Sequence, residues 1–532
     1  MFMANSGTAV LTEKENIFNE LVDEVLKRHL YPEDKYEIAA IIESLGWNDN
    51  MAADVFGVDD VFALAANVWD ALQAKILFVP VVHVDKIKFL KYLSMIVISF
   101  LRGTIFALPM AVSIFCMLTL RFSLWSYLYL SLENATSIAI GTILSFMAVG
   151  GFTQAIARRG FLYIGLGQYY MARKVTFSFL KIGYSFCFIS AAAFLLFNIA
   201  FSVFPWRMTL ITVVYFLFLC CIWLSVTVMY MLRKELVFTG LIIGGILIVF
   251  VLFEILKLNI ILSQLIALTL VSIAGIVIAL YFFIKEERKM EKGIKPLMPR
   301  FSIIFYTYIP YFIYGFLYFT FLFTDRLVAW STNNLYMPYL IWFRGQYELG
   351  LDFSLITLVL PVGLIEVFIS EIMISLEVDQ KKYMVTEIKQ MGRAYVWSYI
   401  KKIVFLTLFS LANAAALYLV MKRLGSSIDL GIFSSSTTHF VFIWSVISYA
   451  LLAVALMNAL LLFCLSQPEM ACKATLYAII VNMFLGFVLS RWVDYSWAVV
   501  GLFAGTVVFV FFTLRRVLKV LNNLDYYLYT AS

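Results

Sequence analysis

The chain of 532 residues is 63% hydrophobic and 14% charged, carries a formal net charge of +7, and contains 50 Phe, 30 Tyr and 11 Trp. No water-soluble fold could hide this much apolar and aromatic surface, so the composition excludes soluble, secreted, fibrous and disordered proteins and indicates a polytopic membrane protein. The six cysteines lie within or beside apolar runs and are expected to be inert thiols, without a disulfide framework or a zinc site: Cys116, Cys187, Cys220, Cys221, Cys464 and Cys472.

The first 80 residues differ in charge from the rest of the chain. They hold five basic and fourteen acidic residues, which gives them a net charge of −9. Phosphate backbones and anionic headgroups repel such a segment, which argues against nucleic-acid binding and against attachment to the membrane surface. The segment has no apolar stretch of the kind that a signal peptide needs. We therefore expect residues 1–80 to form an acidic cytosolic helical domain that docks a protein partner, or one that only caps the membrane part.

Three helices are predicted within this domain. The first covers Glu13–His29, and the second begins near Pro32 and is stopped by Gly46. The third follows Asp60, with an apolar stripe formed by Val61, Leu64, Val68, Trp69 and Leu72. Three short helices can resemble a helix-turn-helix, but the acidity of the segment disfavours DNA as a partner.

From residue 89 onward, apolar stretches long enough to cross a hydrocarbon core of about 30 Å recur with short polar breaks. Twelve are predicted, at about 92–120, 134–157, 175–203, 208–232, 236–256, 260–284, 302–324, 350–374, 402–422, 438–464, 473–490 and 495–514. The longest charged break follows the sixth. The predicted fold is therefore all-α, with two six-helix bundles at 86–284 and 301–520, a cytosolic linker at 285–300 and a cytosolic tail at 521–532.

The distribution of Lys and Arg tests this count independently. With the N-terminus inside, the predicted cytosolic breaks hold 25 basic residues and the outer breaks hold eight. A wrongly merged or split span would scramble this alternation. The bias predicts twelve spans in the cytoplasmic membrane, with both termini in the cytosol. Residues 380–400 are amphipathic, and we expect them to form a helix that lies along the inner leaflet.

No catalytic motif is present. The chain lacks a Walker loop, a GxSxG elbow and an HExxH pair, and its three histidines are scattered at His29, His83 and His439. We therefore expect no enzymatic activity, no metal and no cofactor. The candidates for function are instead ionisable side chains at membrane depth, since each costs about 2.5–3.5 kcal/mol unless it faces protein or water.

The first and the third predicted spans each carry a basic residue inside them. Arg102 lies in the first span, ahead of Gly103 and Pro109, where the helix is loosened. A fixed cation beside a breakable helix suits an anionic group. Lys181 lies in the third span. The side chain of Arg102 could equally extend to the inner headgroups, and for Lys181 that reading is the preferred one.

The eighth predicted span carries three acids. Asp352 and Glu366 are fourteen residues apart, which on a continuous helix places both on one face, about 21 Å from each other. Pro361 lies between them and predicts a kink, and Glu371 lies further in. They could form a proton or cation site, or an acidic lining for a cationic sugar polymer. Alternatively, they pair with Arg102 or Lys181 across the bundle.

The outer connection between Asp325 and Leu349 is rich in aromatic side chains, namely Trp330, Tyr336, Tyr339, Trp342 and Tyr347. Flat rings stack on sugars, so a carbohydrate platform is one reading. An aromatic belt at the membrane boundary is the more ordinary one.

Three segments carry a resemblance to a known family. They are GGFTQAIARRGFLYIGLGQYYMARK, GFLYFTFLFTDRLVAWS with its Asp325–Arg326 pair, and YMPYLIWFRGQYELGLDFSLITLVLPVGLIE. Over about residues 86–520 the chain resembles the Pel-type exopolysaccharide exporter subunit of the multidrug/oligosaccharidyl-lipid/polysaccharide flippase superfamily. The resemblance implies a twelve-helix transporter that moves a nascent, partly cationic sugar polymer outward beside a cytosolic glycosyltransferase. It does not extend to residues 1–80.

The prediction is therefore an exporter of a nascent exopolysaccharide in the bacterial cytoplasmic membrane. Its partners would be the polymer, a cytosolic glycosyltransferase, other membrane subunits of a synthase complex and the lipid bilayer, without nucleic acid. The predicted cavity or substrate residues are Arg102, Lys181, Asp325, Arg326, Trp330, Asp352, Glu366 and Glu371.

Three alternatives remain at this stage. A flippase for lipid-linked oligosaccharide would need a cationic cavity for pyrophosphate, which the acid-rich eighth span disfavours. A membrane-embedded glycosyltransferase should display catalytic acids on a large first outer loop, but the break at 121–133 is short. A non-transporting anchor would recruit the synthase complex through the acidic domain.

Overall fold

The computed structural model describes residues 6–28, 34–78, 89–165, 168–288, 301–332, 340–379, 388–427 and 435–529. These residues are helical almost throughout and contain no β-strand beyond an isolated bridge between Phe122 and Tyr127. Their contacts divide the chain into two compact units, Met1–Lys88 and Phe89–Ser532.

The first unit is a small helical domain. Its elements are α1 (Ser6–Arg28), α2 (Lys35–Ser44), α3 (Asp49–Met51), η1 (Ala52–Phe56) and α4 (Val61–Phe78). Asp34 caps α2 by accepting from the backbone N–H of Glu37 at 2.8 Å, and Asp60 caps α4 by accepting from that of Ala63 at 2.7 Å. The core contains Leu21, Val25, Ile38, Ile42, Leu64, Val68 and Leu72. The three predicted helices are present, and the helical turns over 49–56 are an addition that the sequence pattern did not predict.

The second unit begins with six spans. They are formed by α5 (Phe89–Leu120), α6 (Leu132–Gly165), α7 (Tyr169–Phe201), α8 (Trp206–Met231), α9 (Glu235–Phe250) continued by η2 (Val251–Ile255), and α10 (Ile260–Arg288). Six more follow: α11 (Phe301–Trp330); α12 (Gly345–Leu355), η3 (Ile356–Leu358) and α13 (Val359–Asp379) in one span; α14 (Ile388–Ser427); α15 (Ser436–Cys464); α16 (Pro468–Trp492); and η5 (Tyr495–Trp497) with α17 (Ala498–Asn522). The short α18 (Leu524–Tyr529) ends the described chain.

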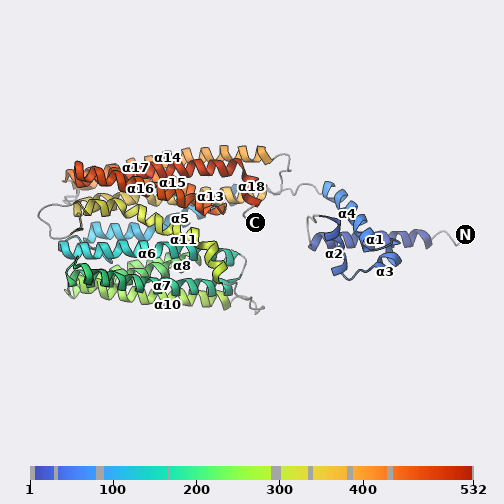
Figure 1. The fold of residues 1–532 in the computed structure, drawn as a ribbon, viewed down its shortest axis with the longest axis horizontal. Helices are drawn as coiled ribbons and strands as arrows, with labels where there is room; N and C mark the ends of the chain where they lie inside the picture. The colour runs from blue at the N-terminus through green and yellow to red at the C-terminus, as the bar shows by residue number, and fades with distance from the viewer. Residues whose placement is uncertain are drawn as a thin grey trace. The chain divides into compact units, whose positions relative to one another are not determined.

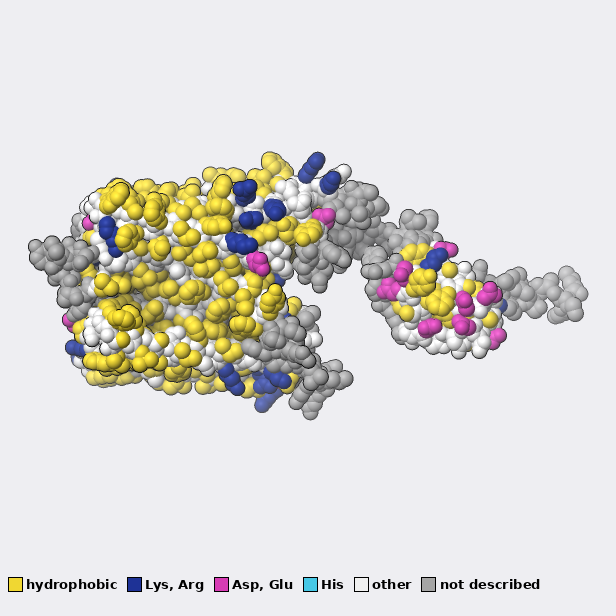
Figure 2. Space-filling view, viewed as in Figure 1, with side chains coloured by type: hydrophobic (Ala, Val, Ile, Leu, Met, Phe, Trp, Pro, Cys, Tyr) yellow, Lys and Arg dark blue, Asp and Glu magenta, His cyan; other side chains and the backbone are white. Residues whose placement is uncertain are grey.

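Among the described residues, twelve helical stretches are long and apolar enough to cross a membrane, which confirms the predicted number of spans and the all-α fold. Figure 2 shows one face of this unit covered by hydrophobic side chains, with Lys and Arg gathered toward the ends of the helices. An apolar side wall is what a lipid-facing bundle requires, because lipid offers no polar partners. The chain is a multi-pass membrane protein.

The first six spans of the second unit (α5 to α10) contact the last six (α11 to α17) at a small number of helix pairs. In Figure 1 helices α14 to α17 lie together on one side and α6, α7, α8 and α10 on the other, with α5 and α11 between them. Among the described helices, the substantial contacts between the groups are those of α5 with η3 and α13, and of α6 with α11. Two helix pairs therefore form the junction between the halves.

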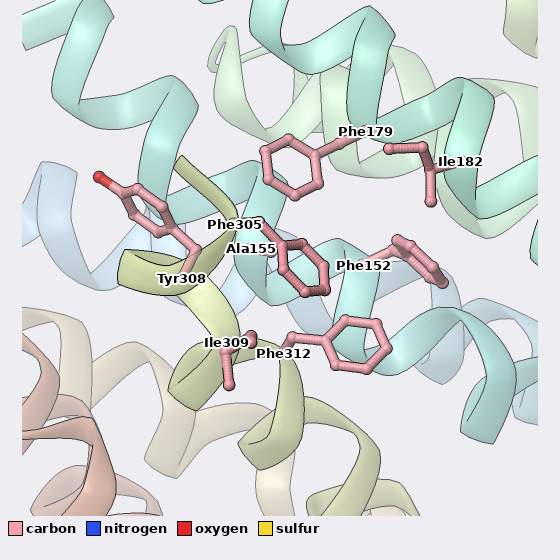
Figure 3. A pocket seen from close by; sticks show the side chains of 8 residues that line it. All are labelled: Phe152, Ala155, Phe179, Ile182, Phe305, Tyr308, Ile309 and Phe312. Atoms are coloured by element: carbon pink, nitrogen blue, oxygen red, sulfur yellow. The ribbon is translucent and has the colours of Figure 1, made fainter. Parts of the chain in front are cut away.

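Glycines let the backbones approach at both pairs. A Cβ atom on Gly103 of α5 would lie 2.8 Å from the Cα of Gly363 on α13, closer than real atoms allow. A Cβ on Gly150 of α6 would lie 2.8 Å from the carbonyl oxygen of Gly315 on α11. Small residues at membrane helix contacts permit such close packing. The backbones therefore touch at these glycines, and phenylalanine rings of α6 pack on rings of α11 beside them: Phe146 with Phe319 and Phe323, and Phe152 with Phe312 (Figure 3).

One prediction about the ninth span is wrong. Residues 388–400 do not form a separate helix along the inner leaflet, because they are the first turns of α14, which runs unbroken for 40 residues. At 1.5 Å per residue this helix is about 60 Å long, twice the hydrocarbon thickness. Its apolar positions Met391 and Tyr395 are buried against protein instead of lipid. The remaining part of that prediction, 380–387, lies outside the described residues.

Candidate functional site

A group of charged side chains is buried where the last turns of α11 meet α12. Arg326 of α11 donates through Nη1 to Glu348 and through Nη2 to Asp352 Oδ1, the latter at 3.0 Å. Glu348 and Asp352 are four residues apart on α12, so both reach the same guanidinium. Arg326 is 7% exposed and Glu348 is 4% exposed. We name Asp325, Arg326, Glu348 and Asp352 the Arg326 cluster.

Aromatic side chains complete the hydrogen bonds of this cluster. Trp330 Nε1 donates to Glu348 Oε1 at 2.8 Å, and Tyr347 Oη donates to Asp325 Oδ2 at 2.8 Å. Asp325 Oδ1 and the hydroxyl of Tyr449 on α15, which lies beside Arg326, are buried without a hydrogen-bond partner. Two fully buried acids against one arginine leave one carboxyl group in excess. Charge balance at this depth therefore calls for a proton or a small cation.

Asp352 is the exposed member of the cluster. Its side chain is 50% exposed, whereas those of Arg326 and Glu348 are 9% and 5% exposed. A half-exposed carboxylate that is hydrogen-bonded to a buried arginine can exchange its partner for a group that arrives from outside. The arrangement can therefore hold a cationic or hydroxylated ligand at Asp352 while the buried part stays fixed.

The eighth span is broken just below the cluster. Pro361 has no N–H to donate to the carbonyl of Thr357, four residues earlier, and the chain forms the 3₁₀ turn η3 at this point. Asn413 of α14 donates through Nδ2 to that free carbonyl at 2.8 Å. The α-helix is therefore interrupted just before Pro361, the residue at which a kink was predicted. The prediction that Asp352 and Glu366 share one helix face assumed a continuous helix. It does not apply here, because the helix is interrupted between them.

Glu366 and Glu371 lie on α13, on the other side of the break. The cations that act most strongly on Glu366 are Arg102 of α5 and Arg233, although neither comes within 4.0 Å of its carboxylate. Glu371 accepts a hydrogen bond from the hydroxyl of Tyr92 on α5 at 3.2 Å and lies 3.4 Å from Lys402 Nζ. These acids therefore link α13 to α5 across the junction between the halves.

The predicted site residues thus fall into separate places. Asp325, Arg326, Trp330 and Asp352 share the Arg326 cluster, and Arg102, Glu366 and Glu371 share the contact between α5 and α13. Lys181 belongs to neither, because its side chain is exposed on α7 and forms no ion pair with a described residue. The structure brings together four of the eight at one point, and their roles in transport stay predictions.

Two residues of the buried group, Glu348 and Tyr449, were not predicted as site residues from the sequence. Glu348 fell outside the eighth span because that span was predicted to start at residue 350, whereas it begins at Gly345. Its i, i+4 relation to Asp352 was the signal that could have found it. Tyr449 lies in an apolar helix, and nothing in its surroundings in the sequence marks it.

The aromatic side chains of the outer connection are mostly buried. Trp330 and Tyr347 are 0% exposed and Trp342 is 9% exposed, so no ring face of these three is open to a sugar in this conformation. Tyr336 and Tyr339 lie outside the described residues. These three rings therefore pack inside the protein, and in this conformation they form neither a carbohydrate platform nor an aromatic belt.

Two arginines cap the end of α11 beside the cluster. Arg344 lies between the rings of Trp342 and Tyr495, with its guanidinium carbon 3.4 Å and 4.3 Å from their centroids, and it donates to the carbonyl of Thr332 at 2.8 Å. Burial lowers the pKa of Arg344, which the nearby Tyr495 opposes. Arg491 donates to the carbonyls of Val328 and Ser331 at 3.1 Å and 3.0 Å. Positive groups at a helix C-terminus stabilise its dipole and fix α11 where it carries Arg326.

No group of three or more His, Cys, Asp or Glu side chains that could hold a metal ion occurs among the described residues.

Comparisons with known proteins identify the fold. No protein-family model and no curated protein matches the chain. A mutant of the MATE transporter VcmN from Vibrio cholerae matches with a TM-score of 0.55 at 14% identity, over 82% of this chain and 98% of that one. A MOP superfamily transporter from Pyrococcus furiosus matches with a TM-score of 0.54 at 14% identity, over 80% and 96%. The eukaryotic MATE transporter AtDTX14 matches with a TM-score of 0.50 at 13% identity, over 80% and 95%. The chain therefore has the fold of MATE transporters.

Proposed function

We propose that this chain exports a saccharide polymer across the cytoplasmic membrane by alternating access between its two halves. The observation that carries transport is the fold, which matches MATE and MOP superfamily transporters over almost their whole length. A fold can serve several functions, so the substrate has to be argued from this chain's own residues.

The junction between the halves supports a mechanism of rocking. The halves meet at two helix pairs, α5 with α13 and α6 with α11, each with glycines in contact. Packed helices can slide past one another by small shear movements. The polar contacts across the junction, such as Tyr92 with Glu371 at 3.2 Å, are single hydrogen bonds that can break and re-form. Such a junction suits two bundles that alternately open toward each side of the membrane.

The Arg326 cluster supports a cationic or hydroxyl-rich substrate. Its excess carboxyl group and the half-exposed Asp352 favour amines and hydroxyls over phosphate groups. The segments around Asp325 and Arg326 also resemble the Pel-type exporter subunit. Together these features favour a partly cationic sugar polymer. The relative from Pyrococcus furiosus is described as having a binding pocket of reversed polarity that suggests a different function, so pocket charge already varies within this fold.

The orientation and partners belong to the same proposal. The bias of 25 against eight basic residues supports placing both termini in the cytosol. The acidic unit Met1–Lys88 would then face the cytosol, where it would dock the glycosyltransferase or another subunit of the synthase complex. A growing polymer would pass from that enzyme into the transporter.

The test is secretion in the bacterium that encodes the chain. We expect Asp352→Asn to leave the protein at normal abundance in the membrane, to lower secreted polymer at least ten-fold and to raise polymer retained in the cells. The matched control is Glu254→Gln, which changes an exposed acid of the fifth span that pairs with Lys257. Normal secretion by Asp352→Asn would contradict the proposed role of Asp352 in binding substrate. Normal secretion after deletion of the whole gene would remove the function.

A further inference from the structure

Two aromatic side chains of the first unit lie outside its core. Tyr36 is the second residue of α2 and is 73% exposed, and Phe62 is the second residue of α4 and is 54% exposed. Their ring centroids are 6.2 Å apart, and their ring planes lie at 65° to each other. The other described aromatic side chains of this unit pack against its core: Phe18, Trp47, Phe56 and Trp69. The unit therefore buries most of its rings and leaves this one pair in solvent.

Three carboxylates are held beside the exposed pair. Asp34 and Asp60 cap the helices that carry the two rings, and Asp49 accepts from the backbone N–H of Val61 at 2.9 Å. Each carboxylate is thus fixed to a turn that carries one of the rings. Residues 34–72 hold eight acids and one lysine, so the surroundings of the rings are negative. Figure 2 shows Asp and Glu around hydrophobic side chains on the visible face of this unit.

These features favour a basic protein segment over other partners. A second copy of the unit carries the same negative charge and would be repelled, as would a nucleic acid or an anionic lipid surface. Two rings at 65° form a corner, which offers a sugar no flat platform for stacking. Aromatic side chains are enriched in protein interfaces, and Lys and Arg bind both carboxylates and ring faces. A segment that carries apolar and basic side chains satisfies both parts of the surface.

We propose that the two exposed rings and the three carboxylates beside them form a docking surface for a basic segment of a cytosolic protein. An apolar side chain of that partner would fill the corner between Tyr36 and Phe62, and Lys or Arg side chains next to it would bind the carboxylates. The inference rests on the proposed docking role and cytosolic orientation of the acidic unit. It does not depend on which solute the chain transports.

The first test is photo-cross-linking of the full-length chain in the bacterium that encodes it. A benzoylphenylalanine replaces Phe62 or, as the control, the exposed Asn67, which lies about 140° around α4 from Phe62. We expect an adduct with a cytosolic protein from the Phe62 position alone. Mass spectrometry should place it on a segment that has more Lys and Arg than Asp and Glu. No adduct, equal adducts from both positions, or an adduct with lipid, saccharide, this chain or an acidic or neutral segment would overturn the proposal.

The second test measures binding of the cross-linked segment, made as a synthetic peptide, to the purified full-length protein. Phe62→Ser should lower the affinity roughly ten-fold. Asp34→Asn with Asp60→Asn should lower it several-fold at low salt and change it little in about 0.5 M salt, because asparagine keeps both helix caps and removes only the charge. The control is Glu20→Gln with Glu24→Gln, two exposed acids of α1, which should bind as the natural chain does. Undiminished affinity in Phe62→Ser or in the double Asn variant would overturn the proposal.

Failure of this inference can be told apart from failure of the proposed function. An adduct on a basic segment, together with normal secretion after deletion of the gene, would remove transport of the polymer and keep the docking surface. Lack of an adduct, together with the expected loss of secretion in Asp352→Asn, would remove the docking surface and keep transport.

Discussion

Gly150 of α6 and Gly315 of α11 face each other so closely that a side chain on Gly315 would collide with the carbonyl oxygen of Gly150. This contact joins the first six spans to the second six, and Gly103 with Gly363 repeats it at the other helix pair. Backbone atoms of the first six and the last six spans therefore touch at both helix pairs, and phenylalanine rings also pack between α6 and α11.

Replacing Gly315 with Ala should separate α6 from α11. The methyl group has no space, so the helices must shift, and we expect secretion to fall several-fold with a lower midpoint of thermal unfolding. The matched control is Gly244→Ala on α9, where an added Cβ meets nothing within 4 Å. It should leave both measurements unchanged, and an equal effect of the two substitutions would contradict a special role for the junction.

Arg326 should be required for stability as well as for transport. Arg326→Gln leaves Glu348 buried without its cation, which destabilises proteins by roughly 3–5 kcal/mol. Adding Glu348→Gln removes the unpaired charge, so the double variant should be more stable than Arg326→Gln alone. Thermal unfolding of the purified variants measures this coupling. Strictly additive effects would show that the two side chains do not interact.

Asn413 should matter because Pro361 leaves the carbonyl of Thr357 free. Asn413→Ala removes the donor, and an unsatisfied buried carbonyl costs about 1–3 kcal/mol. Pro361→Ala introduces an N–H that could replace the lost bond. We therefore expect Asn413→Ala with Pro361→Ala to recover part of the stability. A double variant that is less stable than either single one would contradict this explanation of the break.

A substitution of Trp330 distinguishes a structural role of this side chain from a role in stacking on sugar rings. Trp330→Phe keeps a flat ring but loses the N–H that bonds Glu348 at 2.8 Å. If the hydrogen bond is what matters, the variant should unfold at a lower temperature and secrete less polymer. If Trp330 stacked on sugar rings, the phenylalanine would keep most of the activity and stability. Secretion per molecule of folded protein in the membrane distinguishes the two outcomes.

The number of spans could be predicted from the sequence because length and hydropathy are local properties that lipid imposes on every spanning helix. The alternation of Lys and Arg supplied a second, independent signal. The acids of the eighth span were also visible, as was Pro361, next to which the helix is interrupted. The start of α14 was predicted wrongly. An amphipathic segment such as Met391 to Tyr395 has the same sequence pattern whether its apolar face contacts lipid or protein.

The grouping of the charged residues could not be predicted. Asp352 and Glu366 share a span, but the break at η3 and the neighbouring helices decide which cations they meet. Asp352 lies beside Arg326 of α11, and Glu366 lies near Arg102 of α5. These partners are 26 and 264 residues away in the chain, and only the packing of the twelve helices brings them together. The position of Tyr449 beside the cluster has the same cause.

The central claim is that transport requires the two halves to separate at the end where α5 begins. Tyr92 and Glu371 approach within hydrogen-bond distance there, on α5 and α13. The direct measurement is polymer secretion by a chain with its six native cysteines replaced and with Tyr92→Cys and Glu371→Cys joined by a short, reducible thiol cross-linker. We expect secretion before cross-linking, a block once the two helices are joined, and recovery on reduction, with both single-cysteine variants unaffected by the reagent. Continued secretion by the fully cross-linked chain would contradict alternating access between these halves.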